Sequence, residues 1–162
     1  MNDHAEQWYT DLQLDALPMA ARLGVVMGIE NVDGTDVTSI RKAMEFVKLA
    51  DSPYLQVYPD LGNIAEQQLD AVTELEAGRG HMVAIHVKDV RPGEPRRVPM
   101  GEGTVDWDES FAILAEQNWR GRMMIEMWND DAPDSNARSS SAREFIEDHL
   151  RTAGIPVRRA LA

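Results

Sequence analysis

Short apolar runs recur along the chain, and each is followed by a longer segment in which apolar residues return at helical spacing. A few consecutive apolar residues bounded by Gly, Pro and polar residues are typical of a buried strand, because a buried helix needs a longer run. The pattern therefore predicts strands at residues 24–30, 55–60, 82–86 and 123–126.

The segments around these strands have the periodicity of amphipathic helices. In one of them Ile40, Met44 and Val47 share a face, and Asp36 stands where an N-cap is expected. The predicted helices are residues 11–23, 37–50, 64–77, 107–117 and 135–153. One helix followed by four strand–helix units predicts an α/β fold. Because the strands are nearly continuous apolar runs, we expect a parallel sheet buried on both faces.

The connection after the third strand is unusually long. It runs from Lys88 to about Thr104 and contains three Pro and three Gly. Loops of this length in a compact domain are often functional. It also holds a dense basic stretch with Lys88, Arg91, Arg96 and Arg97. This stretch is either a recognition element for an anionic group such as a phosphate or a solvated loop, and the residues alone leave both readings open.

Composition limits the classes of function. The chain of 162 residues fits one domain, and its net charge is −12, which argues against nucleic acid and anionic membranes as partners. No apolar stretch reaches the roughly 18 residues of a membrane span. The N-terminus lacks the basic and apolar regions of a signal peptide. With no Cys, the chain has no disulfide or thiolate chemistry, and we expect a cytoplasmic protein.

Each predicted strand ends on a residue type that binds metals. These residues are Glu30, Asp60, His86 and Glu126. Taken singly, each has an ordinary structural explanation, such as a helix cap or a core histidine. Parallel strands, however, end at the same edge of a sheet, so the four side chains are expected to gather there. Two Glu, one Asp and one His form a donor set suited to Mn²⁺, Mg²⁺ or Zn²⁺.

The residues around these strand ends resemble a known family. The motifs are Gly28-Ile29-Glu30-Asn31, Val57-Tyr58-Pro59-Asp60-Leu61-Gly62-Asn63, Ala84-Ile85-His86-Val87-Lys88-Asp89, Val98-Pro99-Met100-Gly101-Glu102-Gly103 and Ile125-Glu126-Met127-Trp128. Together they resemble the L-ribulose-5-phosphate 3-epimerase (L-xylulose-5-phosphate 3-epimerase) family of xylose isomerase-like TIM barrels. The resemblance covers residues 20–155, which is nearly the whole chain.

The resemblance implies roles for particular residues. It places the family's divalent metal ligands on Glu30, Asp60, His86 and Glu126, and the acid/base pair of related ketose 3-epimerases on the two Glu. Arg96 matches an Arg that holds substrate, and we expect Lys88 to anchor substrate as well.

Asn63 also has an implied role, because it stands where some relatives have a substrate-binding His. This difference shifts the expected substrate away from free sugars and toward sugar phosphates.

The chain departs from the family in length. The family's (β/α)₈ barrel has eight strand–helix units, and the pattern here supplies four of them, matching strands five to eight. We therefore expect residues 1–162 to form a single partial TIM-barrel domain, the C-terminal half of the barrel. A truncated gene model, a split gene or a remnant would each explain this length. A homo-oligomer or association with the missing N-terminal half would cover the open edges.

The implied reaction is epimerisation at C3 of a ketopentose 5-phosphate, L-ribulose 5-phosphate or L-xylulose 5-phosphate, through a metal-stabilised enediolate. One alternative is an aldose–ketose isomerase of the same superfamily, and another is an inactive half-barrel that needs its missing half. A metal-dependent endonuclease is disfavoured, since the chain has only four His and a charge of −12.

Overall fold

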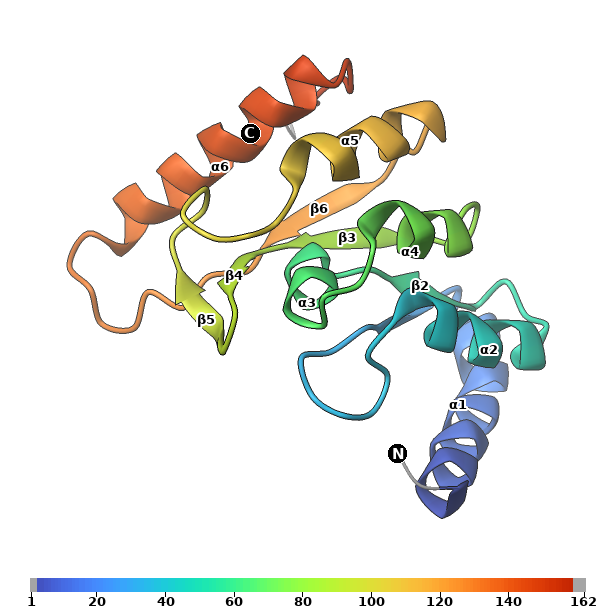
Figure 1. Cartoon of the computed structure of the whole chain (residues 1–162). Coiled ribbons are helices and arrows are strands. Elements are labelled where there is room, and N and C mark those ends of the chain that lie inside the picture. The colour runs from blue at the N-terminus through green and yellow to red at the C-terminus, as the bar shows by residue number, and fades with distance from the viewer. Residues whose placement is uncertain (1–2, 159–162) are drawn as a thin grey trace.

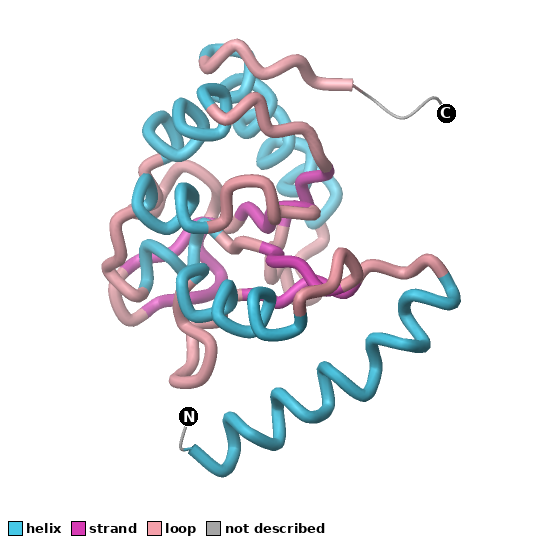
Figure 2. The backbone as a smooth tube through the Cα atoms, turned by 90° about the vertical axis from the view of Figure 1, so that its right-hand side faces the viewer, coloured by secondary structure: helices cyan, strands magenta, loops and turns pink. Residues whose placement is uncertain are grey.

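The computed structural model describes residues 3–158, and its helices pack along the strands (Figures 1 and 2). In chain order the elements are α1 (Asp3–Leu23), β1 (Met27–Glu30), α2 (Ile40–Ala50), β2 (Leu55–Tyr58), α3 (Leu61–Glu66), α4 (Ala71–Ala77), β3 (Ala84–Val87), β4 (Asp89–Arg91), β5 (Glu94–Val98), α5 (Trp107–Glu116), β6 (Arg122–Ile125) and α6 (Ser135–Thr152).

The four predicted strands are present, and they pair in parallel. β1 pairs with β2 from Met27–Leu55 to Glu30–Tyr58, and β3 pairs with β6 in the same orientation. Isolated parallel bridges, including one between Asp60 and His86, join β2 to β3. The resulting order β1-β2-β3-β6 confirms the prediction of parallel strands whose carboxyl ends meet at one edge.

The core lies between the strands and the helices that follow them. Helices α2, α4, α5 and α6 form a series in which each contacts the next. Their apolar faces meet strand residues such as Val57 and Ile85, which are fully buried together with Phe111 and Leu114.

The expectation that both sheet faces are buried is wrong for this chain. Burial alternates along β2 and β3, so that Leu55 and Val57 are buried while Gln56 and Tyr58 are only partly covered. On β6 the side chain of Met124 is 57% exposed. The face turned away from the helices is open because four strands of a barrel curve around an interior that they do not close.

Helix α1 starts earlier than predicted, at Asp3 rather than Asp11. One side of it packs on the domain through Leu17 and Ala20, but a second apolar stripe is exposed. That stripe comprises Trp8, Leu12, Met19 and Leu23. Neither α1 nor any other helix in residues 3–158 is both long and apolar enough to cross a membrane.

Two predicted helices differ in the structure. The helix expected from residue 37 starts at Ile40, and its N-cap is Ser39, not Asp36, because the Ser39 hydroxyl accepts a hydrogen bond from the Lys42 amide. The helix expected at residues 64–77 is two helices, α3 and α4. A left-handed backbone at Gln68 breaks it, and Asp70 caps the second part.

The long connection after β3 is ordered by a short antiparallel hairpin, β4–β5. Asp89 holds its far end, because its buried carboxylate accepts hydrogen bonds from the amides of Gly101 and Gly103. The connection predicted as a long loop is therefore ordered by the hairpin and by the hydrogen bonds of Asp89, and it lies at the carboxyl end of β3.

Gly62 shows how closely α3 approaches this edge of the sheet. A methyl group at Gly62 would lie 2.7 Å from the Lys88 carbonyl oxygen and would also meet the Lys88 side chain. We expect Gly62→Ala to lower the free energy of unfolding by about 1–3 kcal/mol through overpacking. Urea unfolding measures this change. In the control Gly34→Ala the new methyl meets nothing closer than 4.0 Å. Equal midpoints for both variants would contradict the argument.

Candidate metal centre

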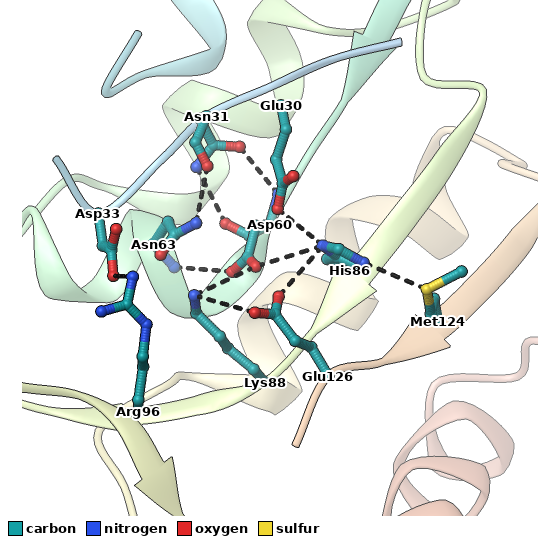
Figure 3. Close-up of polar contacts among 10 residues, drawn as sticks. All are labelled: Glu30, Asn31, Asp33, Asp60, Asn63, His86, Lys88, Arg96, Met124 and Glu126. Carbon is teal, nitrogen blue, oxygen red and sulfur yellow. Dashed lines mark hydrogen bonds and ion pairs between the residues drawn. The ribbon is translucent and has the colours of Figure 1, made fainter. Parts of the chain in front are cut away.

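The four strand-end residues meet at one place (Figure 3). Glu30 ends β1, His86 lies in β3, and Asp60 and Glu126 follow β2 and β6. One possible ligand atom from each residue lies within 4.8 Å of those from the other three. The gathering expected from the parallel order is therefore present in the structure.

His86 sits among the three carboxylates. Its Nδ1 lies 2.7 Å from Glu30 Oε1, 3.3 Å from Glu126 Oε2 and 3.6 Å from Asp60 Oδ2. The hydrogen bond with Glu30 is the main cause that raises the pKa of His86, and the nearby negative charges add to it. The imidazole thus carries a proton more readily than an exposed histidine does.

Asp60 is the most enclosed member of the cluster. It is fully buried; its Oδ1 accepts a hydrogen bond from the Asn63 amide, but Oδ2 has no hydrogen-bond partner. Burial is the largest cause that raises its pKa to about 7, and the charge of Lys88 acts against it. A buried carboxylate oxygen without a partner is costly unless a cation faces it.

The cluster fits a divalent cation. Three carboxylates and one imidazole match the donors that Mn²⁺, Mg²⁺ or Zn²⁺ take in proteins. Asp60 Oδ2, which has no hydrogen-bond partner, points into the cluster, and the hydrogen bond and negative charges that raise the pKa of His86 show that the cluster favours a positive charge. A bound cation would replace the protons that the cluster otherwise attracts.

Lys88 lies against the cluster rather than in solvent. Its side chain is only 5% exposed, and its Nζ lies 3.6 Å from Asp60 Oδ2 and 3.8 Å from Glu126 Oε1. The ammonium group also lies 5.5 Å from the centre of the Trp128 ring. Lys88 is thus an expected substrate anchor whose charged group contacts two of the cluster's carboxylates.

Arg96 reaches the mouth of the site from the β4–β5 hairpin. It forms a 2.9 Å ion pair with Asp33 in the loop after β1, and its guanidinium lies 5.4 Å from the Trp128 ring. Asp33 was not among the residues selected from the sequence, and Trp128 appeared there only as part of a motif, without a role. These contacts join segments far apart in the chain, so no local pattern reports them.

The other arginines of the basic stretch face acidic partners. Arg91 pairs with Glu102 at 3.0 Å, and Arg97 pairs with Asp130 at 2.9 Å. Each charge is compensated by a carboxylate, as that of Arg96 is by Asp33. Lys88 is the basic residue of the stretch that contacts the four-residue cluster directly.

Asn63 lies behind Asp60 and is 3% exposed. Its side-chain amide donates a 2.8 Å hydrogen bond to the carbonyl of Asn31, a buried residue that the sequence did not single out. The Oδ1 atom of Asn63 is buried without a hydrogen-bond partner. Its expected contact with substrate remains a prediction.

A cavity of about 470 Å³ opens beside Glu126, between the hairpin and α6. Lys88, Arg96, Trp128 and Arg138 are among its lining residues. Two of them are the expected substrate anchors, so the cavity connects the cluster with the groups that would hold an anionic part of a substrate.

Comparison with known proteins identifies similar sequences. A family model described as "Xylose isomerase-like TIM barrel" matches residues 3–149. The chain is 36% identical over 154 residues to L-ribulose-5-phosphate 3-epimerase UlaE of Salmonella paratyphi C (strain RKS4594) and of Escherichia coli (strain K12). In both cases the match covers 95% of this chain and 54% of the relative, so the chain spans about half the length of these curated relatives.

Solved structures support the same fold. An L-ribulose 3-epimerase superposes with a TM-score of 0.78 at 17% identity, over 90% of this chain and 54% of the other. A D-tagatose 3-epimerase-like protein gives 0.77 at 20% identity over the same shares. For a 3-keto-D-glucoside 4-epimerase, YcjR of E. coli, the values are 0.69 and 22%, over 88% and 52%. The chain therefore has the architecture of half of such a barrel.

The metal-free chain should lose stability as pH rises from about 5 to about 8. The folded-state pKa of Asp60, about 7, lies above the ordinary 3.8, so the folded chain holds this proton more tightly and that advantage disappears as pH rises to 7. The raised pKa of His86 acts in the same direction: its contribution is complete below 6.5 and is lost above.

Urea unfolding in EDTA at a series of pH values measures this dependence, and saturating Mn²⁺ should weaken or reverse it because the cation replaces the protons. The variant Asp60→Asn serves as control, since it removes the larger titration and should flatten the metal-free profile. A metal-free stability that increases between pH 5 and 8 would rule out this account of the cluster.

Proposed function

The chain belongs to the xylose isomerase-like TIM barrel family, and on that premise we propose that it is the metal-binding half of a cytoplasmic ketopentose-5-phosphate 3-epimerase. The substrates would be L-ribulose 5-phosphate and L-xylulose 5-phosphate. The proposal is supported by curated relatives named as L-ribulose-5-phosphate 3-epimerases and by the four-residue cluster at the strand ends.

One observation carries the proposal: the two glutamates approach the cluster from opposite flanks. Glu30 comes from β1 and Glu126 follows β6, which are the outer strands of the order β1-β2-β3-β6, while Asp60 and His86 come from the strands between them. Figure 3 shows both carboxylates beside the same nitrogen of His86, Glu30 above it and Glu126 below it.

Exposure divides the four residues into two roles. The Glu30 and Glu126 side chains are 32% and 23% exposed, whereas Asp60 is 0% exposed and His86 13%. Groups that exchange protons with a substrate must be accessible, while groups that only hold a cation need not be. The geometry thus favours the glutamates as the proton-transfer pair.

Inversion at C3 of a ketose needs two such groups. One carboxylate removes the C3 proton, which leaves a planar enediolate, and the other returns a proton to the opposite face. A cation held by Glu30, Asp60, His86 and Glu126 would supply Lewis acidity toward the substrate oxygens. We propose that Lys88 and Arg96 anchor the anionic substrate, because both line the cavity beside Glu126.

A complete barrel is part of the proposal. Among residues 3–158, β1 and β6 each pair with a neighbour on one side only, and the apolar stripe Trp8, Leu12, Met19 and Leu23 of α1 is exposed. Open strand edges and an apolar stripe favour association. We propose that four further strand–helix units, upstream in the same polypeptide or in a second chain, cover these surfaces in the active enzyme.

The test fuses this chain to the part of E. coli UlaE that it does not match. The fusion with Mn²⁺ is incubated with L-ribulose 5-phosphate in D₂O and followed by NMR. Deuterium should enter at C3, and L-xylulose 5-phosphate should form. Exchange confined to C1 and C2 would identify an aldose–ketose isomerase. A folded fusion that binds Mn²⁺ but exchanges no hydrogen would mean that this half is catalytically inactive.

In the same fusion, Glu126→Gln should lower the C3 exchange rate by about 10²–10⁴-fold, the usual contribution of a general acid or base. Glu94→Gln is the matched control, because Glu94 lies in the neighbouring β4–β5 hairpin, is 61% exposed and pairs with Arg91. Full activity of the Glu126 variant would exclude the two-glutamate mechanism.

Arg96→Gln in the fusion should raise KM for L-ribulose 5-phosphate about tenfold, since a hydrogen bond to a charged group contributes roughly 1.5–3 kcal/mol. Arg91→Gln should leave KM unchanged, because Arg91 is bonded to Glu94 and Glu102 on the outside of the hairpin. Steady-state kinetics of both variants decide the point. Equal KM values for the two would remove Arg96 from the substrate site.

A further inference from the structure

Three buried residues next to the cluster form a closed ring of hydrogen bonds (Figure 3). The side chain of Asn31 bonds both backbone groups of Asp60: its Oδ1 accepts from the Asp60 amide at 2.8 Å, and its Nδ2 donates to the Asp60 carbonyl at 3.0 Å. The Asp60 carboxylate accepts from the Asn63 amide at 2.8 Å, and the Asn63 side chain donates to the Asn31 carbonyl at 2.8 Å. Each side chain therefore holds the backbone of the next residue.

The hydrogen bonds of the ring begin where the pairing of β1 with β2 ends. The last register pair of β1 and β2 is Glu30 with Tyr58, and Pro59 follows. Beyond it, the Asn31 amide group replaces a strand neighbour for Asp60. From the other side the His86 amide donates to the Pro59 carbonyl at 2.7 Å. The backbone that carries Asp60 is thus fixed between β1 and β3.

This arrangement determines which oxygen of Asp60 is available. The Asn63 amide engages Oδ1, and Oδ2 is left without a hydrogen-bond partner, 3.6 Å from both His86 Nδ1 and Lys88 Nζ. We propose that Asn31 and Asn63 are positioning residues of the metal centre, which hold Asp60 so that it presents Oδ2 alone to the cation. The proposal rests on the metal centre of the proposed function.

A purely structural role explains the ring less well. The three residues are 1%, 0% and 3% exposed, so every polar atom in the ring has lost its contact with solvent. Two of these atoms, Asp60 Oδ2 and Asn63 Oδ1, have no hydrogen-bond partner. Unpaired buried polar atoms lower stability, so a ring selected for stability alone would pair them. Asp60 Oδ2 instead faces His86 Nδ1 and Lys88 Nζ at 3.6 Å, on the side where a cation held by the cluster would reach it.

The test measures Mn²⁺ binding to the 162-residue chain by isothermal titration calorimetry. Asn31→Ala removes two bonds of the ring and Asn63→Ala removes one, while the Asn63 backbone amide stays. Loss of an outer-shell partner typically weakens metal binding about 10–100-fold. We expect Asn31→Ala near the upper end of that range and Asn63→Ala near the lower end.

Gln67→Ala is the matched control. The Gln67 side chain also joins the α3 region to the loop after β1, by donating to the Gly34 carbonyl at 3.2 Å, but this hydrogen bond is exposed and lies outside the ring. Its loss should leave the Mn²⁺ affinity unchanged. Far-ultraviolet circular dichroism verifies that each variant is folded at the temperature of the titration, and thermal melts in EDTA report stability separately.

The outcomes distinguish a failure of the metal centre from a failure of the positioning role of Asn31 and Asn63. If the unsubstituted chain binds Mn²⁺ and the asparagine variants bind it equally well, with only a lower melting temperature, the ring is structural and the inference is wrong. If the unsubstituted chain binds no Mn²⁺, the metal centre itself fails, and the ring's role fails with it. If Asn31→Ala does not fold, Asn63→Ala decides, and unchanged affinity there overturns the inference.

Discussion

The structure depends on one electrostatic constraint, which is the crowding of three carboxylates and an imidazole at the carboxyl edge of a parallel sheet. Parallel pairing of β1, β2, β3 and β6 places these side chains within reach of one another, and like charges at such distances repel strongly in a partly buried site. Neighbouring groups and changes of protonation reduce this repulsion. Lys88 is buried against two of the carboxylates, His86 attracts a proton, and burial raises the pKa of Asp60.

The four residues of the cluster also differ in burial and in how firmly they are held. Asp60 is held by the backbone on both sides and by an asparagine ring, so it cannot move away from the other charges. The glutamates at the flanks have no comparable restraint and remain partly exposed. A rigid centre with two accessible carboxylates suits a reaction in which the cation stays fixed while protons move.

The sequence was sufficient for the parts of the structure that repeat locally. Strands with a short apolar run and a ligand residue at the end could be predicted because strand ends share an edge whatever the loops do. The break at Gln68 could not, since it follows from α3 starting at its Asp60 cap rather than at residue 64. Asn31, Asp33 and Trp128 were missed for a different reason. Their contacts join distant loops, and only the folded chain brings those loops together.

Cation binding and the exclusion of water from a substrate would place different demands on this chain. All four metal-binding residues and the ring behind Asp60 lie in this chain, whereas the inner face of its strands is open. The four candidate ligands come from β1, β3 and the residues that follow β2 and β6, so the proposed cation site needs no ligand from other units. Exclusion of water from a substrate requires a closed interior, which four strands do not provide. Under the proposed function, this half would therefore bind the cation, and turnover would require the completed barrel.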